Sequence, residues 1–253
     1  MKTLIELKSV TNRFGSQIVH DGISLELYED ETLGLVGGSG SGKSVLLRTM
    51  LGLNKPQQGE VLVAGTNLYD LSPEQRLDIQ KKWGVLFQNG ALFSGLSVLD
   101  NVALPLREHS GLSPKAIDEL ALLKLRMAGL EAEAADKYPS ALSGGMVTRA
   151  GVARAMALDP EILFLDEPTG ALDPVAAASL DELMQSLHEI LKLSILIITH
   201  DPNTLVTVCD RIAMIVDKKV ESGTLDDMLK STNPQVREYF SGPRVKAVLA
   251  ERH

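Results

Sequence analysis

Short runs of apolar residues alternate with helical patterns along most of the chain. Residues 162–165 and 194–199 are mostly apolar, as is typical of strands buried on both faces of a parallel sheet. Shorter apolar segments bounded by glycine or polar residues are also predicted to be strands, at 33–36, 60–64 and 84–87. Together with the helices described next, this alternation predicts an α/β protein.

Three helices are predicted from their start signals and apolar spacing. Residues 43–51 follow a glycine-rich loop and form the first. Ser113 and Pro114 begin the second, because serine is a favoured N-cap and proline a favoured first helical residue. Asp173 and Pro174 begin the third in the same way. Its apolar residues recur at the helical period, at Leu180, Leu183, Met184, Leu187 and Leu191.

The order of the elements predicts the domain organisation. A β-rich start is followed by an α/β region that contains a helical stretch at about 97–158. We therefore expect a three-layer α/β domain over residues 1–230, with a helical subdomain inserted into it. Residues 231–253 contain several basic side chains and are expected to form an appended C-terminal extension rather than part of the core.

Composition narrows the functional classes. The chain has 253 residues and a net charge of −8, from 25 basic and 33 acidic side chains. Because nucleic-acid-binding proteins usually have a basic surface, we do not expect nucleic acid as a partner. Cys209 is the single cysteine and has no partner for an internal disulfide, so we interpret it as a small buried apolar side chain.

Hydropathy predicts a protein of the cytosol. The apolar runs are much shorter than the roughly 20 residues of a membrane-spanning helix. Glu6 interrupts the N-terminus before the apolar region of a signal peptide would be complete. We therefore expect the chain to reach a membrane only through a partner.

A glycine-rich loop between a predicted strand and a predicted helix gives the clearest chemical signal. It fits the pattern G-x-x-x-x-G-K-[ST], in which backbone N–H groups and the following helix start bind phosphate oxygens. Lys43 would reach the β- and γ-phosphates of a nucleotide, and the Ser44 hydroxyl would bind Mg²⁺. A flexible glycine–serine linker is the alternative, and the flanking strand and helix argue against it. The loop consists of Gly37, Gly38, Ser39, Gly40, Ser41, Gly42, Lys43 and Ser44.

Two adjacent acidic residues follow a predicted buried strand. Asp166 stands at the carboxyl end of this strand, where a carboxylate that assists Mg²⁺ binding is expected. Glu167 comes next and is the candidate general base for an attacking water molecule. Taken alone, two adjacent acidic residues are explained by a solvated turn. The presence of a phosphate-binding loop in the same chain argues against this alternative.

The sequence Leu-Ser-Gly-Gly at residues 142–145 lies between these two sites. Taken alone, it fits a helix start capped by Ser143. Together with the phosphate loop, Gln88, the acidic pair and His200, it resembles the ATP-binding subunits of ABC transporters over about residues 4–230. The resemblance implies the ABC ATPase fold of P-loop NTPases, with a β-rich N-terminal subdomain, a RecA-like core and an inserted helical subdomain.

The resemblance also implies roles for single residues around ATP and Mg²⁺. Phe14 matches the aromatic residue that stacks on adenine, although a loop hydrophobe without this role remains an alternative. Gln88 matches the glutamine that contacts Mg²⁺ and the attacking water and that senses the membrane partner. His200 matches the histidine that faces the γ-phosphate. Val45 replaces a frequent serine or threonine in the ATP site, so one hydroxyl contact to the α-phosphate is missing while the backbone contacts remain.

Other implied contacts require a second copy of the chain. Ser143, Gly144 and Gly145 match the signature that contacts the γ-phosphate of ATP held by the opposite subunit. Asp173 matches an acidic residue at the interface of this dimer, a role compatible with capping a helix. Two copies are therefore expected to meet head to tail, as a homodimer with two ATP molecules between them.

Two further segments, 84–93 and 100–109, resemble the Mla/Mce-type branch of the family. This resemblance implies a transporter of phospholipids or related hydrophobic molecules between the inner and outer membranes of bacteria. The implied partners are a transmembrane permease, a small STAS-domain protein and an Mce-domain lipid-binding protein. The ATPase would then be peripheral, on the cytoplasmic side of the inner membrane. From residue 233 on, a C-terminal extension that wraps onto the neighbouring ATPase is implied.

The region after Gln88 is expected to contact the permease, at Phe93, Leu96 and Leu106. Packing between the two lobes of the domain is the alternative for Leu92, Phe93 and Leu96. The remaining histidines stand in no motif and are interpreted as solvated or packing residues; they are His20, His109, His188 and His253.

Three other functions remain as alternatives. An ABC transporter for another substrate would contain the same motifs. A soluble ABC-type ATPase acting on DNA or ribosomes usually has two cassettes or long coiled-coil insertions, of which this sequence gives no sign. A small-molecule kinase or GTPase does not need the Leu-Ser-Gly-Gly motif, and residues 54–57 lack the acidic residue of a guanine-reading motif.

Overall fold

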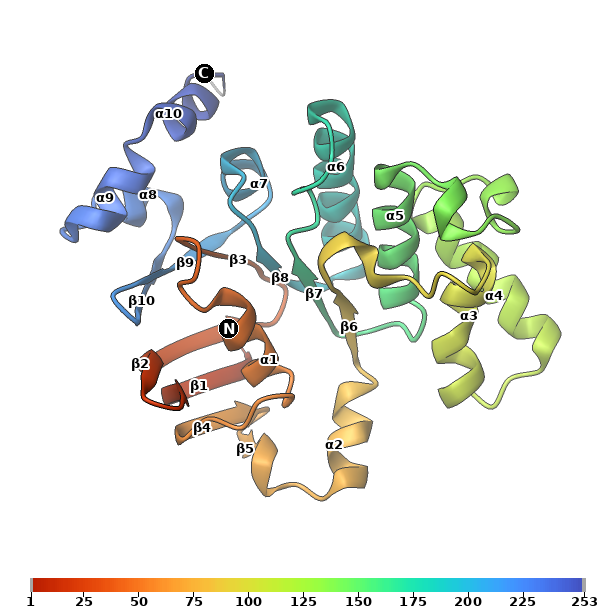
Figure 1. The fold of residues 1–253 in the computed structure, drawn as a ribbon, viewed down its shortest axis with the longest axis horizontal. Coiled ribbons are helices and arrows are strands. Elements are labelled where there is room, and N and C mark those ends of the chain that lie inside the picture. Colours follow the sequence, from red (N-terminus) through yellow and green to blue (C-terminus); the bar gives the residue numbers. More distant parts are fainter. Residues whose placement is uncertain (1, 252–253) are drawn as a thin grey trace. The chain divides into compact units, whose positions relative to one another are not determined.

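Strands and helices alternate along the chain, which confirms the predicted α/β class (Figure 1). The computed structural model describes residues 2–251, so His253 lies outside the described residues. The chain divides into two units. The first contains the residues up to 77 and from 196 onward, and the second contains residues 78–195.

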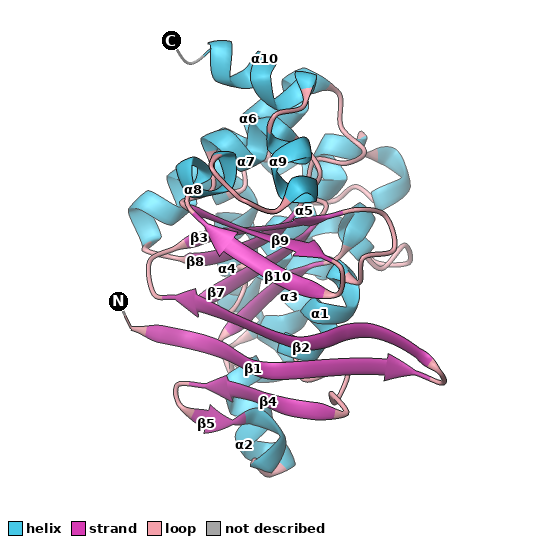
Figure 2. Cartoon of the chain, turned by 90° about the vertical axis from the view of Figure 1, so that its left-hand side faces the viewer, coloured by secondary structure: helices cyan, strands magenta, loops and turns pink. Residues whose placement is uncertain are grey.

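An antiparallel sheet forms the N-terminal part of the first unit, with its strands side by side in Figure 2. In spatial order the strands are β2 (Gln17–Tyr28), β1 (Thr3–Phe14), β4 (Gln58–Val63) and β5 (Thr66–Asn67). The side chains of Ile5, Leu7 and Val10 on β1 are buried. Alternation with exposed polar residues is typical of a sheet that packs one face against a core. Strand β4 confirms the strand predicted at 60–64.

A second group of strands in the first unit leads to the phosphate loop. Strand β3 (Thr32–Gly37) pairs in parallel with β9 (Arg211–Val216), and β10 (Lys219–Gly223) pairs antiparallel with β9. Every residue of β3 is buried. The strand runs into the loop and then into α1 (Lys43–Met50), as the sequence predicts.

The C-terminal helices contribute to the core of the first unit, which corrects the expectation of an appended tail outside the core. Two helices lie in the expected tail, α9 (Pro234–Phe240) and α10 (Pro243–Glu251). They follow α7 (Pro202–Thr207) and α8 (Leu225–Leu229) of the same unit. Val236, Phe240 and Val245 are buried in one cluster with apolar residues of β9 and α7. Because Val236 and Phe240 are four residues apart, one face of α9 presents both to the core. The basic composition of this segment conceals that apolar spacing.

The second unit contains a parallel strand pair and a group of helices. Strand β6 (Trp83–Leu86) pairs with β7 (Ile162–Asp166). The helices are α3 (Val98–His109), α4 (Pro114–Met127), α5 (Gly144–Ala155) and α6 (Pro174–Leu191). Helices α3, α4 and α5 contact one another, within the stretch predicted to be helical. Short 3₁₀ turns occur at Gln88–Ala91, Ala132–Ala134 and Pro139–Ala141, and in the first unit at Leu68–Asp70.

Two elements cross the boundary between the units, α2 (Pro73–Gln80) and β8 (Ser194–Ile198). The predicted helix starts are confirmed, because the Ser113 and Asp173 side chains cap α4 and α6. Of the helices within residues 2–251, none is both long and apolar enough to cross a membrane.

Candidate functional site

Helix α1 begins without a side-chain cap from the described residues. Its N-cap is Gly42, at φ 99°, and its first turn holds no acidic residue. By contrast, a serine, threonine, aspartate or asparagine side chain caps each helix from α3 to α9. The leading N–H groups of α1 are therefore available to an external anion, and the helix dipole favours negative charge there.

The phosphate loop is held in shape by its own polar groups. The Lys43 ammonium donates to the carbonyl oxygens of Gly37, at 2.8 Å, and Gly38, at 3.3 Å. The Ser41 N–H donates to the same Gly38 oxygen at 3.1 Å. Gly40 has φ +75°, a left-handed conformation that favours glycine, and an added methyl group there would meet nothing within 4 Å among the described residues. The loop is therefore tightly hydrogen-bonded at Gly37 and Gly38 and has free space around Gly40.

The Ser44 side chain is exposed in the first turn of α1, and Val45, which follows it, is half-buried. A serine hydroxyl is an oxygen ligand of the type that Mg²⁺ accepts, as are the carboxylate of Asp166 and the amide oxygen of Gln88. Both of these side chains are also at least partly exposed. The donor chemistry of each unit, Ser44 in the first and Gln88 and Asp166 in the second, therefore fits Mg²⁺.

Two other predicted residues of the first unit lie at strand ends. Phe14 ends β1, and its ring is 53% exposed, so a planar base has access to it. His200 is exposed and follows β8. The Thr199 N–H donates to the Leu35 carbonyl oxygen at 3.3 Å, which ties the segment before His200 to the strand that leads into the phosphate loop.

A pocket of about 160 Å³ borders the phosphate loop in the first unit. Gly40 and Ser41 contribute its loop side, and the start of β2 contributes Gln17, Ile18 and Val19. The remaining lining residues are Ile215, Asp217 and Lys218. The hairpin that follows Phe14 and the phosphate loop therefore share one hollow.

In the second unit, Gln88 and Asp166 follow two paired strands. Leu86 of β6 lies opposite Leu165 of β7 in a parallel register. Gln88 comes two residues after this pair and Asp166 one residue after it. Because the carboxyl ends of parallel strands meet at one edge of a sheet, the structure brings these two polar residues to the same edge of the second unit.

Glu167 has a backbone conformation that is rare for a residue with a side chain. Its φ is 51°, in the left-handed region. The Gly170 N–H donates to the Glu167 carbonyl oxygen at 3.2 Å and closes a turn. Such conformations cost free energy and occur preferentially at functional sites. The predicted catalytic base therefore stands on a turn directly after β7.

The signature residues form the exposed start of α5. The Ser143 hydroxyl accepts from the Met146 N–H at 3.3 Å and so caps the helix. A methyl group added to Gly144 would come no closer than 3.7 Å, to the Ala171 carbonyl oxygen, and one added to Gly145 would come no closer than 3.7 Å, to Ala176. The chain itself therefore leaves room above both glycines, and the capping role of Ser143 is confirmed.

Asp173 lies beside this helix start. Its carboxylate accepts from the N–H groups of Val175 at 3.1 Å and Ala176 at 3.0 Å, and so caps α6. The Val175 side chain is 80% exposed. Since a methyl group added at Gly144 would face the Ala171 carbonyl oxygen, the structure brings the Asp173 turn and the signature together on one exposed surface of the second unit.

The loop after Gln88 is anchored by an arginine that sequence reasoning missed. Asn89, Gly90 and Ala91 all have positive φ, at 59°, 74° and 45°. Arg154, near the end of α5, donates to the carbonyl oxygens of Gly90 at 2.9 Å and Ala91 at 2.7 Å. Its guanidinium also lies 6.0 Å from the centre of the Phe93 ring. No local sequence signal marks this contact, because 63 residues separate Arg154 from Ala91.

The residues expected to contact the permease differ in exposure. The Phe93 side chain is 55% exposed, and Leu96 is half-buried. Leu106 is only 3% exposed, so the expectation for this residue is wrong. It lies on the apolar face of α3, whose other members Val98 and Val102 are also buried.

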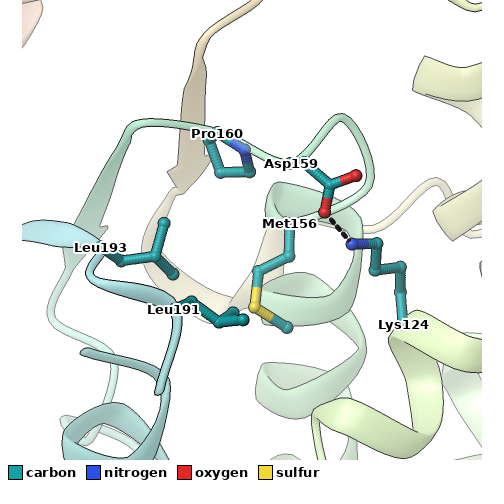
Figure 3. A pocket seen from close by; sticks show the side chains of 6 residues that line it. All are labelled: Lys124, Met156, Asp159, Pro160, Leu191 and Leu193. Carbon is teal, nitrogen blue, oxygen red and sulfur yellow. Dashed lines mark hydrogen bonds and ion pairs between the residues drawn. The ribbon is translucent and has the colours of Figure 1, made fainter. Parts of the chain in front are cut away.

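A second pocket, of about 170 Å³, lies in the second unit (Figure 3). Lys124 and Asp159 form an ion pair at one side of it, and the other lining residues are Met156, Pro160, Leu191 and Leu193. None of these lining residues belongs to the predicted site. Cys209, interpreted from the sequence as buried, is half-buried in the first unit.

Comparisons with known proteins agree with these motifs. Residues 20–170 match the family described as "ABC transporter". The chain is 37% identical over 242 residues to the "Intermembrane phospholipid transport system ATP-binding protein MlaF" of Haemophilus influenzae, covering 95% of this chain and 91% of that protein. It is 39% identical over 246 residues to the "Probable ribonucleotide transport ATP-binding protein mkl" of Mycobacterium leprae, covering 97% of this chain and 71% of that protein.

Among solved structures, the dimeric ABC transporter cassette MJ0796 is similar, with a TM-score of 0.80 and 34% identity over 87% of this chain and 98% of that one. A post-hydrolysis dimer of the same cassette contains ADP and Pi, and it matches with a TM-score of 0.79. The ABC ATPase fold expected from the motifs is thereby confirmed. The chain belongs to the ABC transporter family, as an ATP-binding and ATP-hydrolysing subunit.

Proposed function

We propose that this chain drives the transport of phospholipids or related hydrophobic molecules between the inner and outer membranes of bacteria. The similarity to MlaF, which spans nearly the full length of both chains, supports this substrate class most strongly. The relative named for ribonucleotide transport has a similar sequence identity of 39%, but this chain covers only 71% of its length. Ribonucleotide transport is therefore the second candidate.

Within the first unit, the proposed role of the phosphate loop is to bind the phosphates of ATP through its N–H groups and Lys43. The uncapped start of α1 supports this role. The exposed ring of Phe14 stacks on adenine, and His200 faces the γ-phosphate. Ser44 is the proposed Mg²⁺ ligand of this unit. Bound Mg²⁺ neutralises negative charge on the phosphates.

Within the second unit, Glu167 is the proposed general base. Its carboxylate takes a proton from a water molecule whose oxygen attacks the γ-phosphorus. The bond between the γ-phosphorus and the bridging oxygen breaks, and ADP is the leaving group. Gln88 orients the water molecule, and Gln88 and Asp166 are proposed as further Mg²⁺ ligands. The position of Glu167 directly after β7, next to Asp166, supports its catalytic role.

The proposed active form is a head-to-tail homodimer. Ser143, Gly144 and Gly145 would contact the γ-phosphate of ATP bound to the second copy, with Asp173 at the interface. The open space above both glycines and the exposed Val175 support this arrangement. Because ATP would bind the closed dimer more tightly than the separated one, ATP binding shifts the population towards closure.

The proposed partners are a transmembrane permease, a STAS-domain protein and an Mce-domain lipid-binding protein, with the ATPase on the cytoplasmic side of the inner membrane. Exposed Phe93 and half-buried Leu96 are the proposed permease contacts. The proposed domain limits are 1–230 for the ATP-binding domain, with its helical subdomain at about 97–158, and 231–253 for a C-terminal extension that packs into the core of the first unit.

Purification of the tagged chain from native membranes in mild detergent, followed by mass spectrometry, tests the proposal. We expect a permease, an Mce-domain protein, a STAS-domain protein and bound phospholipid. Recovery of a permease with bound ribonucleotide, or with a different substrate-binding protein, would contradict the lipid assignment and leave the ATPase assignment intact. Recovery only with ribosomes or nucleic acid would contradict the transport role of this chain.

A further inference from the structure

The imidazole ring of His20 lies directly against the last glycine of the phosphate loop. His20 is on β2 and is fully buried. A methyl group added to Gly42 would come within 2.4 Å of His20 Nε2 and 2.5 Å of Val19 Cγ1. The loop therefore rests on two consecutive residues of β2, and one of them is a titratable side chain to which the proposed mechanism assigns no role.

A buried chain of hydrogen bonds determines which nitrogen of His20 holds the proton. The Thr49 hydroxyl donates its hydrogen to the Val45 carbonyl oxygen at 2.9 Å, so it must accept from the Asn12 amide group, 3.1 Å away. The same amide nitrogen lies 3.0 Å from His20 Nδ1. Since this nitrogen only donates, Nδ1 accepts, and the single proton of a neutral ring is on Nε2.

The His20 Nε2–H group is a buried donor that points towards the loop. Burial lowers the pKa of His20 to about 4, against a smaller opposite effect of the Gly42 backbone, so the ring is neutral at pH 7. Among residues 2–251, Nε2 has no hydrogen-bond partner of regular geometry. Its contact with the Gly42 backbone is therefore a weak one, and a poorly satisfied buried donor is unfavourable and calls for an explanation.

We propose that His20 is a positioning residue for nucleotide binding, which rests on the proposed role of the loop as the ATP phosphate site. Its Nε2–H group packs against Gly42. The hydrogen bonds from Thr49 through Asn12 to His20 hold the ring in place between α1 and β1. When phosphate draws the loop N–H groups towards itself, Nε2–H donates a regular hydrogen bond to the Gly42 carbonyl oxygen. Nucleotide binding therefore strengthens the weak contact that this donor makes with the Gly42 backbone.

Two matched substitutions distinguish the role of Nε2 from that of Nδ1. In His20→Gln, the longer side-chain amide places an N–H near the position of Nε2. In His20→Asn, the shorter one reaches only the position of Nδ1 and leaves the space beneath Gly42 empty. We expect the dissociation constant for Mg·ADP, measured by calorimetry on the full chain, to rise about tenfold in His20→Asn and less than threefold in His20→Gln, since one hydrogen bond accounts for roughly a tenfold change.

Equal dissociation constants in the wild type and His20→Asn would overturn the proposal, as would a larger loss in His20→Gln than in His20→Asn. Because binding is measured without turnover, a wild-type chain that binds no ADP would instead contradict the proposed ATP site itself. These outcomes therefore distinguish the two proposals.

Nitrogen-15 NMR of the labelled wild-type chain gives a second test that requires no folded variant. We expect the His20 signals to show a neutral ring protonated at Nε2, and the Nε2–H resonance to shift when Mg·ADP binds. His20 is assigned by comparison with His20→Gln, or by its coupling to Asn12 if that variant fails to fold. A ring protonated at Nδ1, or an unchanged Nε2–H resonance in the ADP complex, would overturn the proposal.

Discussion

The guanidinium group of Arg154 donates a hydrogen bond of 2.9 Å to the carbonyl oxygen of Gly90. This contact joins the last turn of α5 to the loop that begins at Gln88. The same helix begins at Gly144 of the signature and is capped by Ser143. One rigid element of the second unit therefore contacts both the candidate water-orienting loop and the candidate dimer surface.

Replacing Arg154 by methionine should release this loop. Two hydrogen bonds to a charged donor are lost and two carbonyl oxygens lose their partner, so we expect a loss of about 2 kcal/mol in the free energy of unfolding. ATP turnover should fall at least tenfold, while ADP affinity stays within threefold. Urea unfolding, steady-state ATPase assays and calorimetry measure these quantities.

Arg107→Met is the matched control for this prediction. Arg107 is exposed and pairs with Asp100 at 2.8 Å on the surface of the same unit. Exposed ion pairs contribute about 0–1 kcal/mol, so stability and turnover should change little. Equal effects of the two substitutions would argue against a specific role for Arg154.

Replacing Glu167 by glutamine should abolish turnover but not nucleotide binding. Loss of a positioned general base costs about 10²–10⁴-fold in rate. We also expect a long-lived dimer in the presence of ATP and Mg²⁺, because closure is retained and hydrolysis is blocked. Analytical ultracentrifugation and ATPase assays test both points. Turnover within threefold of the wild type, or a strictly monomeric variant at saturating ATP, would contradict the assignment.

Gly144→Ala should prevent this ATP-dependent dimer without unfolding the chain. Gly144 lies outside the left-handed region, and the nearest atom to an added methyl group is 3.7 Å away, so stability should stay within about 1 kcal/mol. In the proposed dimer, the γ-phosphate of ATP bound to the second copy lies against Gly144. The added methyl group would occupy the space that this phosphate needs. The Glu167→Gln background and ultracentrifugation provide the readout, and a dimer of unchanged lifetime would contradict the proposed contact.

Gly151→Ala in the same helix is the opposite control. An added methyl group there would lie 2.5 Å from Leu86 Cδ1 and 3.1 Å from the Gly90 carbonyl oxygen. Overpacking of this kind costs about 1–3 kcal/mol. This variant should therefore lose stability, as thermal unfolding would show, which Gly144→Ala should not.

The burial of His20 predicts a stability that falls as the pH falls from 7 to 5. The unfolded chain binds a proton at His20 near pH 6.5, whereas the folded chain does so only near pH 4. Between these values the unfolded state binds more protons, so acid favours unfolding. The expected contribution of His20 is a loss of about 2 kcal/mol from pH 7 to pH 5.

Comparison with His20→Gln isolates this contribution from the carboxylates that titrate in the same range. The variant should lose about 2 kcal/mol less than the wild type between the two pH values, as measured by urea unfolding. Identical pH dependence of the two proteins would show that the folded state does not depress the pKa of His20.

Phe93→Asp and Leu106→Asp should have different effects on thermal stability and on copurification with the permease, because Phe93 is exposed and Leu106 is buried. Phe93 is exposed, so its substitution should leave thermal stability within about 0.5 kcal/mol and reduce copurification with the permease. Leu106 is buried, and an unpaired charge there should cost about 3 kcal/mol or more. Unchanged recovery of the permease with Phe93→Asp would remove this residue from the proposed contact.

Local sequence determined the elements whose signals lie within a few residues of one another. The phosphate loop follows a buried strand and precedes a helix, and its glycines allow the left-handed conformations found at Gly40 and Gly42. The caps at Ser113, Ser143 and Asp173 depend only on hydrogen bonds to nearby N–H groups. Each of these features was predictable because a side chain and the backbone it contacts are close in the chain.

Tertiary structure decided the contacts between distant segments. Arg154 reaches Gly90 across 64 residues, Asn12 reaches Thr49 across 37, and His20 packs against Gly42. The basic composition around α9 does not reveal that Val236 and Phe240 are buried. The resemblance of residues 100–109 to a family branch does not reveal that Leu106 is buried either. Burial and hydrogen-bond partners depend on which surfaces the folded chain brings together, and short-range periodicity leaves several such pairings open. The sequence by itself therefore determined the family and the chemical groups of the site, whereas the packing that holds those groups in position was decided only by the folded structure.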